Sequence, residues 1–308
     1  MKIGKVPVRN RVFLAPMVDI TTLPYRLLCQ GYGAGMVYSE MVVAQSLIYG
    51  SPSALASVKT CKEERPFGVQ LAGNDSKVLL AAAEKTMSDL LDLNFGCPSY
   101  KVLGNDMCSA LLNQPDKIKK IVSYLVDNLD RPITAKIRLG YNKKNYISVA
   151  SFIENAGASA LCVHGRMAID GYDTPADWTS VKELKKILSI PIIGNGDVRD
   201  GKSAQHLLDT VDFVMVGRAA IGDPFIFDRI NRYLKNKEIV EKPMLEEKYS
   251  SFLMYLKLCK KYNMEDFTMI HRLSLSFAKN VLCGAKLRRA LNFCKNVDDI
   301  KSTFERFI

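Results

Sequence analysis

The sequence predicts an α/β protein, a TIM (β/α)8 barrel followed by a small all-helical C-terminal domain. Eight short apolar runs rich in β-branched residues alternate with amphipathic segments of helical length. This is the pattern of parallel strands buried on both faces. Polar residues and glycines gather where these runs end, and the last quarter of the chain has helical patterns without a strand-like run. Eight strand-helix repeats is the number that closes a barrel.

The expected strands are Val12–Met17, Met36–Met41, Phe67–Ala72, Leu90–Cys97, Ile133–Leu139, Ala160–Arg166, Pro191–Asp197 and Phe213–Ala219. The helical patterns between them include Ser76–Met87, Pro115–Leu129, Tyr146–Asn155, Thr179–Ile187 and Lys202–Leu208. Nearly every expected strand ends in residues that a buried strand avoids, among them Gln70, Asn94, Lys136 and His164. Because all strands of a closed barrel end around one axis, we expect one functional site at its C-terminal face.

The C-terminal quarter predicts helices at Leu245–Tyr262, Met269–Ala278, Leu287–Phe293 and Val297–Phe307, where apolar and charged residues alternate at helical spacing. We therefore expect a barrel domain over residues 1–234 and a helical domain over residues 244–308. The charged segment between them, residues 235–243, ends in Pro243 and is the expected linker.

The composition limits the classes of binding partner and the cellular compartment that we expect for this protein. The chain of 308 residues is 48% hydrophobic and 24% charged, as in ordinary globular proteins, and its net charge is +11. Such positive potential favours nucleic acid or an anionic membrane surface as partner. Of the eight cysteines, no two are two to four residues apart, so no metal site is expected. With neither a secretory signal nor a membrane-length apolar run, a cytoplasmic protein with reduced thiols is expected.

Glycines at two neighbouring strand ends predict a phosphate site. Gly217 and Arg218 follow a buried strand and precede an expected helix, whose first turn would present free backbone amides. One repeat earlier stands the run from Gly194 to Asp197. These are strands seven and eight, where this barrel commonly holds a phosphate. The alternative is that the glycines only form tight turns.

Lys136 lies within an apolar strand, where an unpaired ammonium is costly, so it needs an anionic partner. Three partners are compatible with the sequence: the N1–C2=O edge of a reduced flavin, a carboxylate in an ion pair, or a carbonyl substrate bound as a Schiff base.

Cys97 ends an expected strand between Gly96 and Pro98. An unperturbed thiol has a pKa of about 8.5, so we expect it to be mostly protonated at neutral pH and able to act as a general acid. Five of the other thiols fit ordinary packing: Cys29, Cys162, Cys259, Cys283 and Cys294.

Eight motifs stand in order along the chain: Leu14-Ala-Pro-Met-Val18, Gly68-Val-Gln-Leu71, Leu93-Asn-Phe-Gly-Cys-Pro98, Ala135-Lys-Ile-Arg138, Val163-His-Gly-Arg166, Gly171-Tyr172 before Trp178, Gly194-Asn-Gly-Asp197 and Val216-Gly-Arg218. Taken together, these motifs resemble the tRNA-dihydrouridine synthase family. The resemblance spans essentially the whole chain. It implies a flavoprotein that uses FMN as bound cofactor and NADPH as reductant, and that reduces the C5=C6 bond of uridines in tRNA to dihydrouridine.

The resemblance also implies roles for single residues. Cys97 matches the general acid that protonates C5, while flavin N5 delivers a hydride to C6. The cofactor positions are Ala15, Pro16, Met17, Gln70, Lys136, His164, Asn195, Gly196, Asp197, Gly217 and Arg218. The positions that contact the flipped uracil are Asn94, Arg138, Arg166 and Tyr172. A flipped nucleotide needs its flanks held, and the basic residues that we expect to contact RNA are Lys101, Lys286, Arg288 and Arg289.

One segment departs from the family pattern. The stretch after the cysteine is usually rich in lysine and ends in glycines, whereas this chain ends it with Met107, Cys108 and Ser109. Other functions remain open from the residues themselves. They are an FMN-dependent dehydrogenase of a free small molecule, such as a dihydroorotate-oxidising enzyme, a non-catalytic FMN-containing RNA-binding protein, and a Schiff-base aldolase. A monomer is expected.

Overall fold

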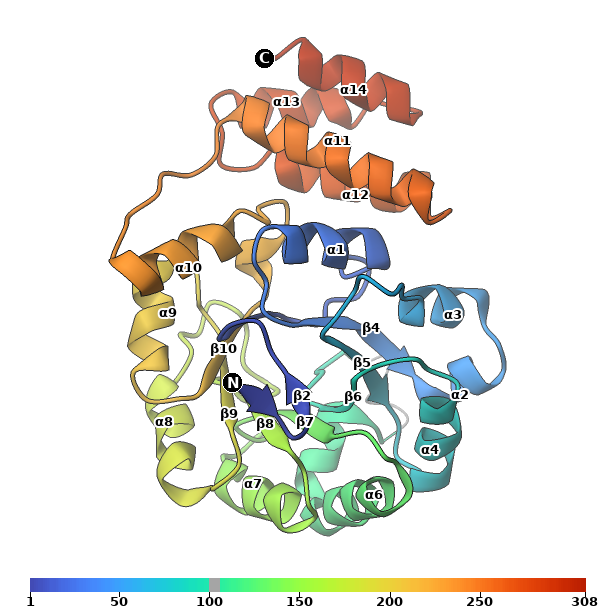
Figure 1. Ribbon diagram of the computed structural model, residues 1–308, viewed down its shortest axis with the longest axis vertical. Helices are drawn as coiled ribbons and strands as arrows, with labels where there is room; N and C mark the ends of the chain where they lie inside the picture. Colours follow the sequence, from blue (N-terminus) through green and yellow to red (C-terminus); the bar gives the residue numbers. More distant parts are fainter. Residues whose placement is uncertain (100–105) are drawn as a thin grey trace.

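The computed structural model describes residues 1–99 and 106–308, and its centre is an eight-stranded parallel sheet (Figure 1). The strands run in the order β3 (Val12–Leu14), β10 (Phe213–Val216), β9 (Ile192–Asn195), β8 (Ala160–His164), β7 (Ile133–Arg138), β6 (Leu90–Phe95), β5 (Phe67–Ala72) and β4 (Val37–Val43). Phe13 and Met36 form a parallel bridge that joins the two outer strands. The sheet therefore closes, and the predicted TIM barrel is confirmed.

All eight expected strands form, but several stop early. β3, β6, β8 and β9 end at Leu14, Phe95, His164 and Asn195, so the residues that follow lie on loops above the barrel. The runs expected at Val12–Met17 and Leu90–Cys97 are therefore strands only as far as Leu14 and Phe95.

Helices surround the sheet: α1 (Leu23–Gly31), α4 (Ser76–Glu84), α6 (Pro115–Asn128), α7 (Tyr146–Asn155), α8 (Trp178–Ile187), α9 (Gly201–Leu208) and α10 (Ile226–Asn236). Shorter helical segments are α2 (Ala44–Ile48), α3 (Pro52–Val58), η1 (Cys108–Asn113) and η2 (Arg218–Ala220). Asp75, Asp177 and Asp200 begin α4, α8 and α9, where each carboxylate accepts backbone N–H bonds that the first turn leaves unpaired.

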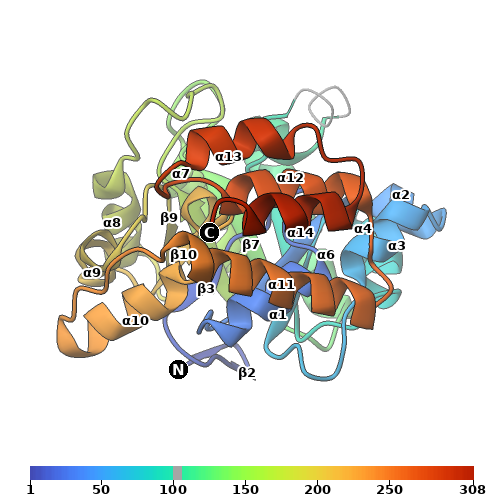
Figure 2. The same ribbon diagram turned by 90° about the horizontal axis from the view of Figure 1, so that it is seen from above.

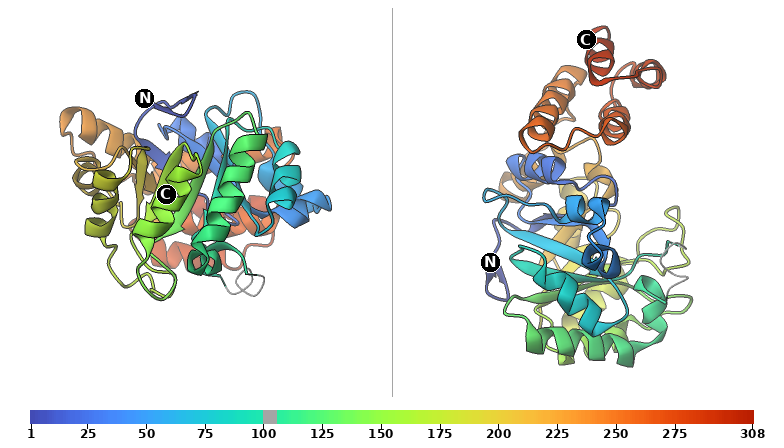
Figure 3. Two further views of the ribbon diagram at one scale, coloured as in Figure 1. Left: turned by 90° about the horizontal axis from the view of Figure 1, so that it is seen from below. Right: turned by 90° about the vertical axis from the view of Figure 1, so that its right-hand side faces the viewer.

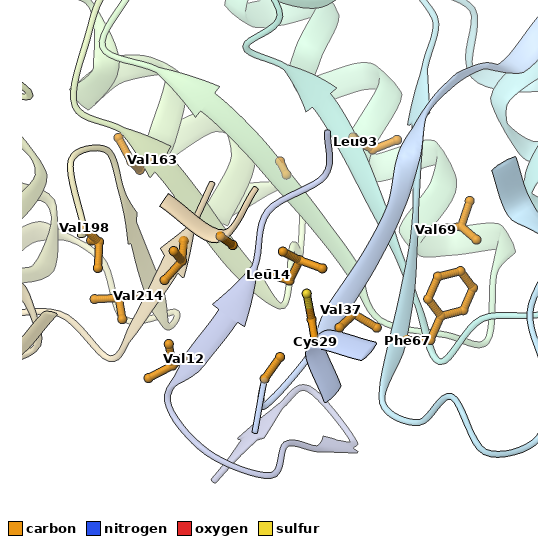
Figure 4. Close-up of a cluster of buried hydrophobic side chains, with 14 of the residues drawn as sticks. Val12, Leu14, Cys29, Val37, Phe67, Val69, Leu93, Val163, Val198 and Val214 are labelled. Carbon is orange, nitrogen blue, oxygen red and sulfur yellow. The ribbon is translucent and has the colours of Figure 1, made fainter. Parts of the chain in front are cut away.

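The apolar core has two layers because successive residues of a strand point to opposite faces. Val12, Leu14 and Val214 belong to the outer layer between sheet and helices, part of which Figure 4 shows. Phe13 and Met215 point inward and fill the barrel interior. A short amino-terminal hairpin, β1 (Lys2–Ile3) with β2 (Val6–Pro7), adds Ile3 and Val6 to this inner cluster and closes one end of the barrel.

The predicted C-terminal helices form: α11 (Leu245–Lys261), α12 (Phe267–Phe277), α13 (Gly284–Leu291) and α14 (Val297–Glu305). They pack together beside α1 at one edge of the barrel (Figures 1 and 3). Helix α10 continues to Asn236, so the segment expected as a linker is helical in its first two residues. In the described part of the chain, no helix has both the length and the apolar character needed to cross a membrane.

Candidate active site

A cavity of about 800 Å³ opens at the carboxyl ends of the barrel strands. It is lined by every residue that the sequence analysis assigned to catalysis, cofactor or uracil: Ala15, Pro16, Met17, Gln70, Asn94, Cys97, Lys136, Arg138, His164, Arg166, Tyr172, Asn195, Gly196, Asp197, Gly217 and Arg218. The N-terminus and the loop between β8 and α8 lie on opposite sides of the barrel in the right-hand view of Figure 3. The cavity mouth is thus at the end away from the amino-terminal hairpin.

Strand alternation explains why polar side chains meet inside this cavity. Cys162 and Ile193 belong to the inner apolar cluster of the barrel. His164 and Asn195 stand two positions later on the same strands, so they point the same way, one layer higher. The inner layer therefore changes from apolar to polar over one step along each strand, and the polar layer forms the floor of the cavity.

A chain of buried hydrogen bonds leads from the barrel interior to Cys97. Thr134 Oγ1 donates to Asp92 Oδ1 at 2.6 Å, and Gln70 Nε2 donates to Asp92 Oδ2 at 2.7 Å. Asn94 Nδ2 donates to Gln70 Oε1 at 2.8 Å, and its Oδ1 accepts the backbone N–H of Cys97 at 2.8 Å. Asn94 thereby holds the turn that carries Cys97, a positioning task that the sequence analysis did not anticipate.

Asp92, which lies below the cavity and positions Gln70, is a residue of this hydrogen-bond chain that the sequence analysis missed. Burial raises the pKa of its carboxyl, while the hydrogen bonds from Thr134 and Gln70 act in the opposite direction. The signal was available, because an aspartate in the middle of the apolar run Leu90–Phe95 needs buried partners.

The environment of Cys97 corrects one expectation. The hydrogen bond with the Cys108 side chain lowers the pKa of Cys97 to about 6, against the opposing effect of burial, and the charges of Arg138 and Lys136 add to the lowering. The same contact raises the pKa of Cys108. The thiolate of Cys97 is therefore more favoured in the free protein than the unperturbed pKa used in the sequence analysis implies.

Lys136 has an amide partner in place of a carboxylate. Its Nζ donates to Asn195 Oδ1 at 2.9 Å, and Asn195 Nδ2 donates to Met215 O at 2.8 Å. Among the described residues no carboxylate lies within 4.0 Å of this ammonium, so Lys136 forms no direct ion pair, although its charge opposes the rise that burial causes in the pKa of Asp92. The half-buried charge still faces the cavity and is available to an anionic group.

His164 is buried and uncharged. Burial lowers its pKa to about 2, and the positive charges of Lys136, Arg138, Arg166 and Arg218 contribute further. Its Nδ1 has no hydrogen-bond partner among the described residues. A buried ring nitrogen without a partner, at the wall of a cavity, is ready to bond to a ligand placed there.

Asp197 joins two arginines at the other end of the cavity. Arg166 Nη2 bonds to its carboxylate oxygens at 3.0 and 2.8 Å, and Arg218 Nη2 at 3.1 Å. Burial raises the pKa of Asp197, but the bonds from the Ala176 N–H and from Arg166 outweigh it and the pKa is lowered. The Arg218 guanidinium also lies 4.1 Å from the centre of the Tyr172 ring.

The structure adds a loop-holding contact to the role expected of Arg166, whose uracil contact stays a prediction, and it changes the expectation of a helix after Gly217. Arg166 is buried and donates hydrogen bonds to Asp197 and to the Thr174 and Tyr172 carbonyls. These bonds hold the loop after β8. Its Nη1 is the one guanidinium nitrogen without a partner in the described chain. Gly217 is followed by the three-residue 3-10 turn η2 and not by a regular helix, which begins only at Ile226. Within this turn, the backbone N–H groups of Ala220 and Ile221 donate to the carbonyls of Gly217 and Arg218.

The expected RNA contacts divide into three groups. Lys286 and Arg289 are exposed on α13, which in Figure 2 lies on the side where the loop between β8 and α8 projects. Arg288 is partly buried, and its Nη1 donates to Ala278 O at 3.0 Å, which stabilises the end of α12. Lys101 lies outside the described residues. In the described ranges, no group of three His, Cys, Asp or Glu side chains is arranged to hold a metal ion.

Comparison with known proteins decides the family. The dihydrouridine synthase family profile matches residues 13–307. The chain belongs to the dihydrouridine synthase family. The chain is 39% identical to tRNA-dihydrouridine synthase B of Pseudomonas putida, over 80% of this chain and 75% of that one. It is 33% identical to the protein of the same name from Pasteurella multocida, over 95% and 91%. Membership of the dihydrouridine synthase family makes the chain an oxidoreductase.

A solved structure supports the fold of this dihydrouridine synthase family member independently. The 6-hydroxypseudooxynicotine amine oxidase of Pseudomonas geniculata superimposes with a TM-score of 0.58 over 77% of this chain and 49% of that one. Its 13% identity makes the likeness one of fold alone.

Proposed function

We propose that the chain is an FMN-dependent tRNA-dihydrouridine synthase, which uses NADPH to reduce the C5=C6 bond of uridines in tRNA and takes the second hydrogen as a proton from Cys97. One observation carries the proposal: in a chain of this family, Cys97 and the expected flavin-contacting side chains line the same cavity. The names of the relatives, tRNA-dihydrouridine synthase B, support tRNA as the substrate class.

The cavity suits a flavin mononucleotide. Its volume of about 800 Å³ falls within the usual size of cofactor sites. Arg218, half-exposed at the end near Gly217, suits the phosphate, and the Lys136 ammonium suits the carbonyl-bearing edge of the ring. The unpartnered Nδ1 of His164 supplies a further polar contact. Ala15, Pro16, Met17 and Gln70 would border the ring, with Asn195, Gly196 and Asp197 nearer the ribityl chain.

When bound, FMN supplies the hydride that reduces the base. The chain's own residues orient the base, exclude water and move the proton. Cys97 must hold a proton when the base arrives. A base that covers the thiolate displaces water around it, and this desolvation raises the pKa of Cys97 and favours the protonated form.

Arg138 and Tyr172 complete the face for the base. Arg138 is buried at the wall, where its Nη1 donates to Met167 O at 2.7 Å, and its remaining donors suit a uracil carbonyl. Tyr172 is 56% exposed at the rim. A base within folded RNA reaches such a cavity only by extrusion, so the neighbouring nucleotides need support from outside the barrel. We assign residues 1–234 to catalysis and residues 244–308 to binding tRNA.

The test is reduction of tRNA by the purified protein with FMN and NADPH, followed by mass spectrometry of nucleosides. We expect dihydrouridine in the wild type. Cys97→Ala should retain the yellow flavin absorption but lower the rate of dihydrouridine formation by about 100- to 10,000-fold, the usual contribution of a general acid. Cys61→Ala, which removes a half-buried thiol that does not line the cavity, should react normally.

Three results would contradict the proposal. Wild-type activity of Cys97→Ala would remove the thiol from proton transfer. Turnover of free orotate or uracil without RNA would indicate a small-molecule enzyme. Flavin binding without any modified base would indicate an RNA-binding role, and a protein unable to bind FMN would direct attention to the Lys136 amine as a nucleophile.

A further inference from the structure

Cys108 occupies a backbone position that ordinarily favours glycine. Its φ of 55° lies in the left-handed region, and its side chain is fully buried. Cys108 therefore places a buried thiol at a backbone conformation that usually belongs to glycine. The proposed reduction of uridine does not use this thiol.

The fold holds Cys108 beside Cys97. Cys97 packs against the small buried cluster that contains Met107 and Cys108. Ser109, next to Cys108, binds the Cys97 carbonyl twice, through its backbone N at 3.3 Å and its Oγ at 2.9 Å. These two bonds hold the backbones of the two cysteines together, and the packing of Cys97 against the cluster that contains Cys108 places the two side chains near each other.

The two thiols differ in access. Cys97 lines the open cavity, where small molecules reach it. Cys108 lies behind it, and its Sγ is 3.8 Å from the Met41 thioether. An exposed thiol backed by a buried one is the arrangement in which the first reacts with an oxidant and the second then attacks it.

We propose that Cys97 and Cys108 are a redox modification site, at which a peroxide converts the two thiols to a reversible disulfide. The Cys97 thiolate attacks one peroxide oxygen, and the O–O bond breaks to leave a sulfenic acid and, after protonation, water. Cys108 loses its proton and its sulfur attacks the sulfenic sulfur, which expels the hydroxyl as a second water. The thiols lose two electrons and two protons in total, and the peroxide gains them.

Charge supports the order of the two steps. The lowered pKa of Cys97 makes it the thiolate of the pair at neutral pH, and the thiolate is the nucleophile toward peroxide. Cys108 has a raised pKa and stays protonated until the sulfenic acid forms. Lys136 and Arg138 provide the positive surroundings that favour the Cys97 thiolate.

Two consequences follow. The disulfide consumes the thiol that donates the proton, so the oxidised protein should not reduce uridine, a consequence that rests on the proposed function. The disulfide also keeps Cys97 from further oxidation to sulfinic acid, which thiols do not reverse.

The test treats the purified full-length flavoprotein with an equimolar amount of hydrogen peroxide, blocks free thiols and digests without reduction. Trypsin cleaves after Lys101, between the two cysteines, so a disulfide joins two peptides. We expect this linked pair in wild type, its loss after dithiothreitol, and recovery of activity. Cys283→Ser, which removes an exposed thiol elsewhere, should still form it.

Cys108→Gly restores the residue that the backbone favours and removes the second thiol. It should give no linked pair, and after several equivalents of peroxide it should regain less than about a tenth of the activity that dithiothreitol restores to wild type treated in the same way, because a second peroxide oxidises the unprotected Cys97 sulfenic acid to sulfinic acid. The proposal is wrong if wild-type Cys97 stays a free thiol, if it oxidises without joining Cys108, or if Cys108→Gly recovers as wild type does. Linkage in a protein that forms no dihydrouridine would refute only the proposed function.

Discussion

Two residues determine the position and the ionisation of the Cys97 thiol: Asn94, which precedes it in the same turn, and Cys108, which follows it in the sequence. Asn94 accepts the Cys97 backbone N–H at 2.8 Å, and the Cys108 side chain lowers the pKa of the Cys97 thiol. The first contact sets where the sulfur lies, and the second sets how readily it ionises. The protonation state of this thiol therefore depends on a residue that does not touch the substrate.

At the residue scale, the pH dependence of Cys97 alkylation by iodoacetamide measures this control. Because the pKa is lowered to about 6, alkylation should be nearly constant above pH 7 and fall as the pH drops through about 6. Cys108→Ala removes the largest lowering contribution, so the midpoint should move to higher pH. Met41→Leu changes the packing against Cys108 without removing a thiol and should leave the midpoint in place. An unshifted midpoint in Cys108→Ala would exclude the thiol-thiol hydrogen bond as the cause.

At the scale of elements, α13 presents one face to its own domain and another to solvent. Leu287 and Leu291 are buried, and Arg288 is tied to the end of α12. Lys286 and Arg289 are the exposed cations of α13, and this helix lies on the side of the molecule toward which the β8–α8 loop projects (Figure 2). Only these two of the three α13 cations are therefore free to meet a polyanion.

We expect the double variant Lys286→Ala with Arg289→Ala to bind tRNA more weakly and with less salt dependence. Each lost phosphate contact lowers the slope of log K against log salt by about 0.7 to 0.9, so the slope should fall by about 1 to 2. The matched control, Lys120→Ala with Lys186→Ala, removes the same charge from exposed positions on α6 and α8. Equal slopes for the two double variants would place the RNA surface elsewhere.

At the scale of the whole molecule, the helical region is packed against the barrel and not merely attached to it. Tyr25 on α1 and Tyr255 on α11 meet edge to face with ring centres 6.2 Å apart. The turn after β10 is equally close, because a Cβ on Gly222 would lie 2.2 Å from the Ser276 carbonyl carbon on α12. Tyr25 also accepts the Gly222 N–H at 3.0 Å. The angle at which the helices face the cavity is thus set by packing.

Gly222→Ala tests that packing. The substitution should lower the free energy of unfolding by about 1 to 2 kcal/mol for the positive φ of 72° and by a further 1 to 3 kcal/mol or so for the clash with α12. Gly50→Ala isolates the first contribution, because Gly50 has a φ of 70° and no atom within 4 Å of an added Cβ. Denaturant unfolding of both variants gives the difference. Equal losses would mean that the helices yield at this contact.

Much of the fold was predictable because its causes are local. Buried parallel strands need apolar, β-branched runs, helices need one apolar face, and both patterns stand in the sequence at barrel spacing. The polar site was also predictable, because Gln70, Lys136 and Asn195 interrupt runs that are otherwise apolar. Polar side chains at such positions indicate a site at the carboxyl ends of the strands. The role of Asp92 was not predicted, because its partner Thr134 lies on a neighbouring strand, 42 residues away in the sequence.

The sequence by itself determined the repeating architecture, the family and which side chains gather at the cavity. Only the tertiary structure decided what those side chains do to one another: that Asn94 holds the Cys97 turn, that Arg166 binds Asp197, and that Cys108 lowers the pKa of Cys97. The reason is physical. Propensity and periodicity act over a few neighbouring residues, whereas ionisation and hydrogen bonding act over a few ångströms, and the closed barrel alone brings distant residues within that range.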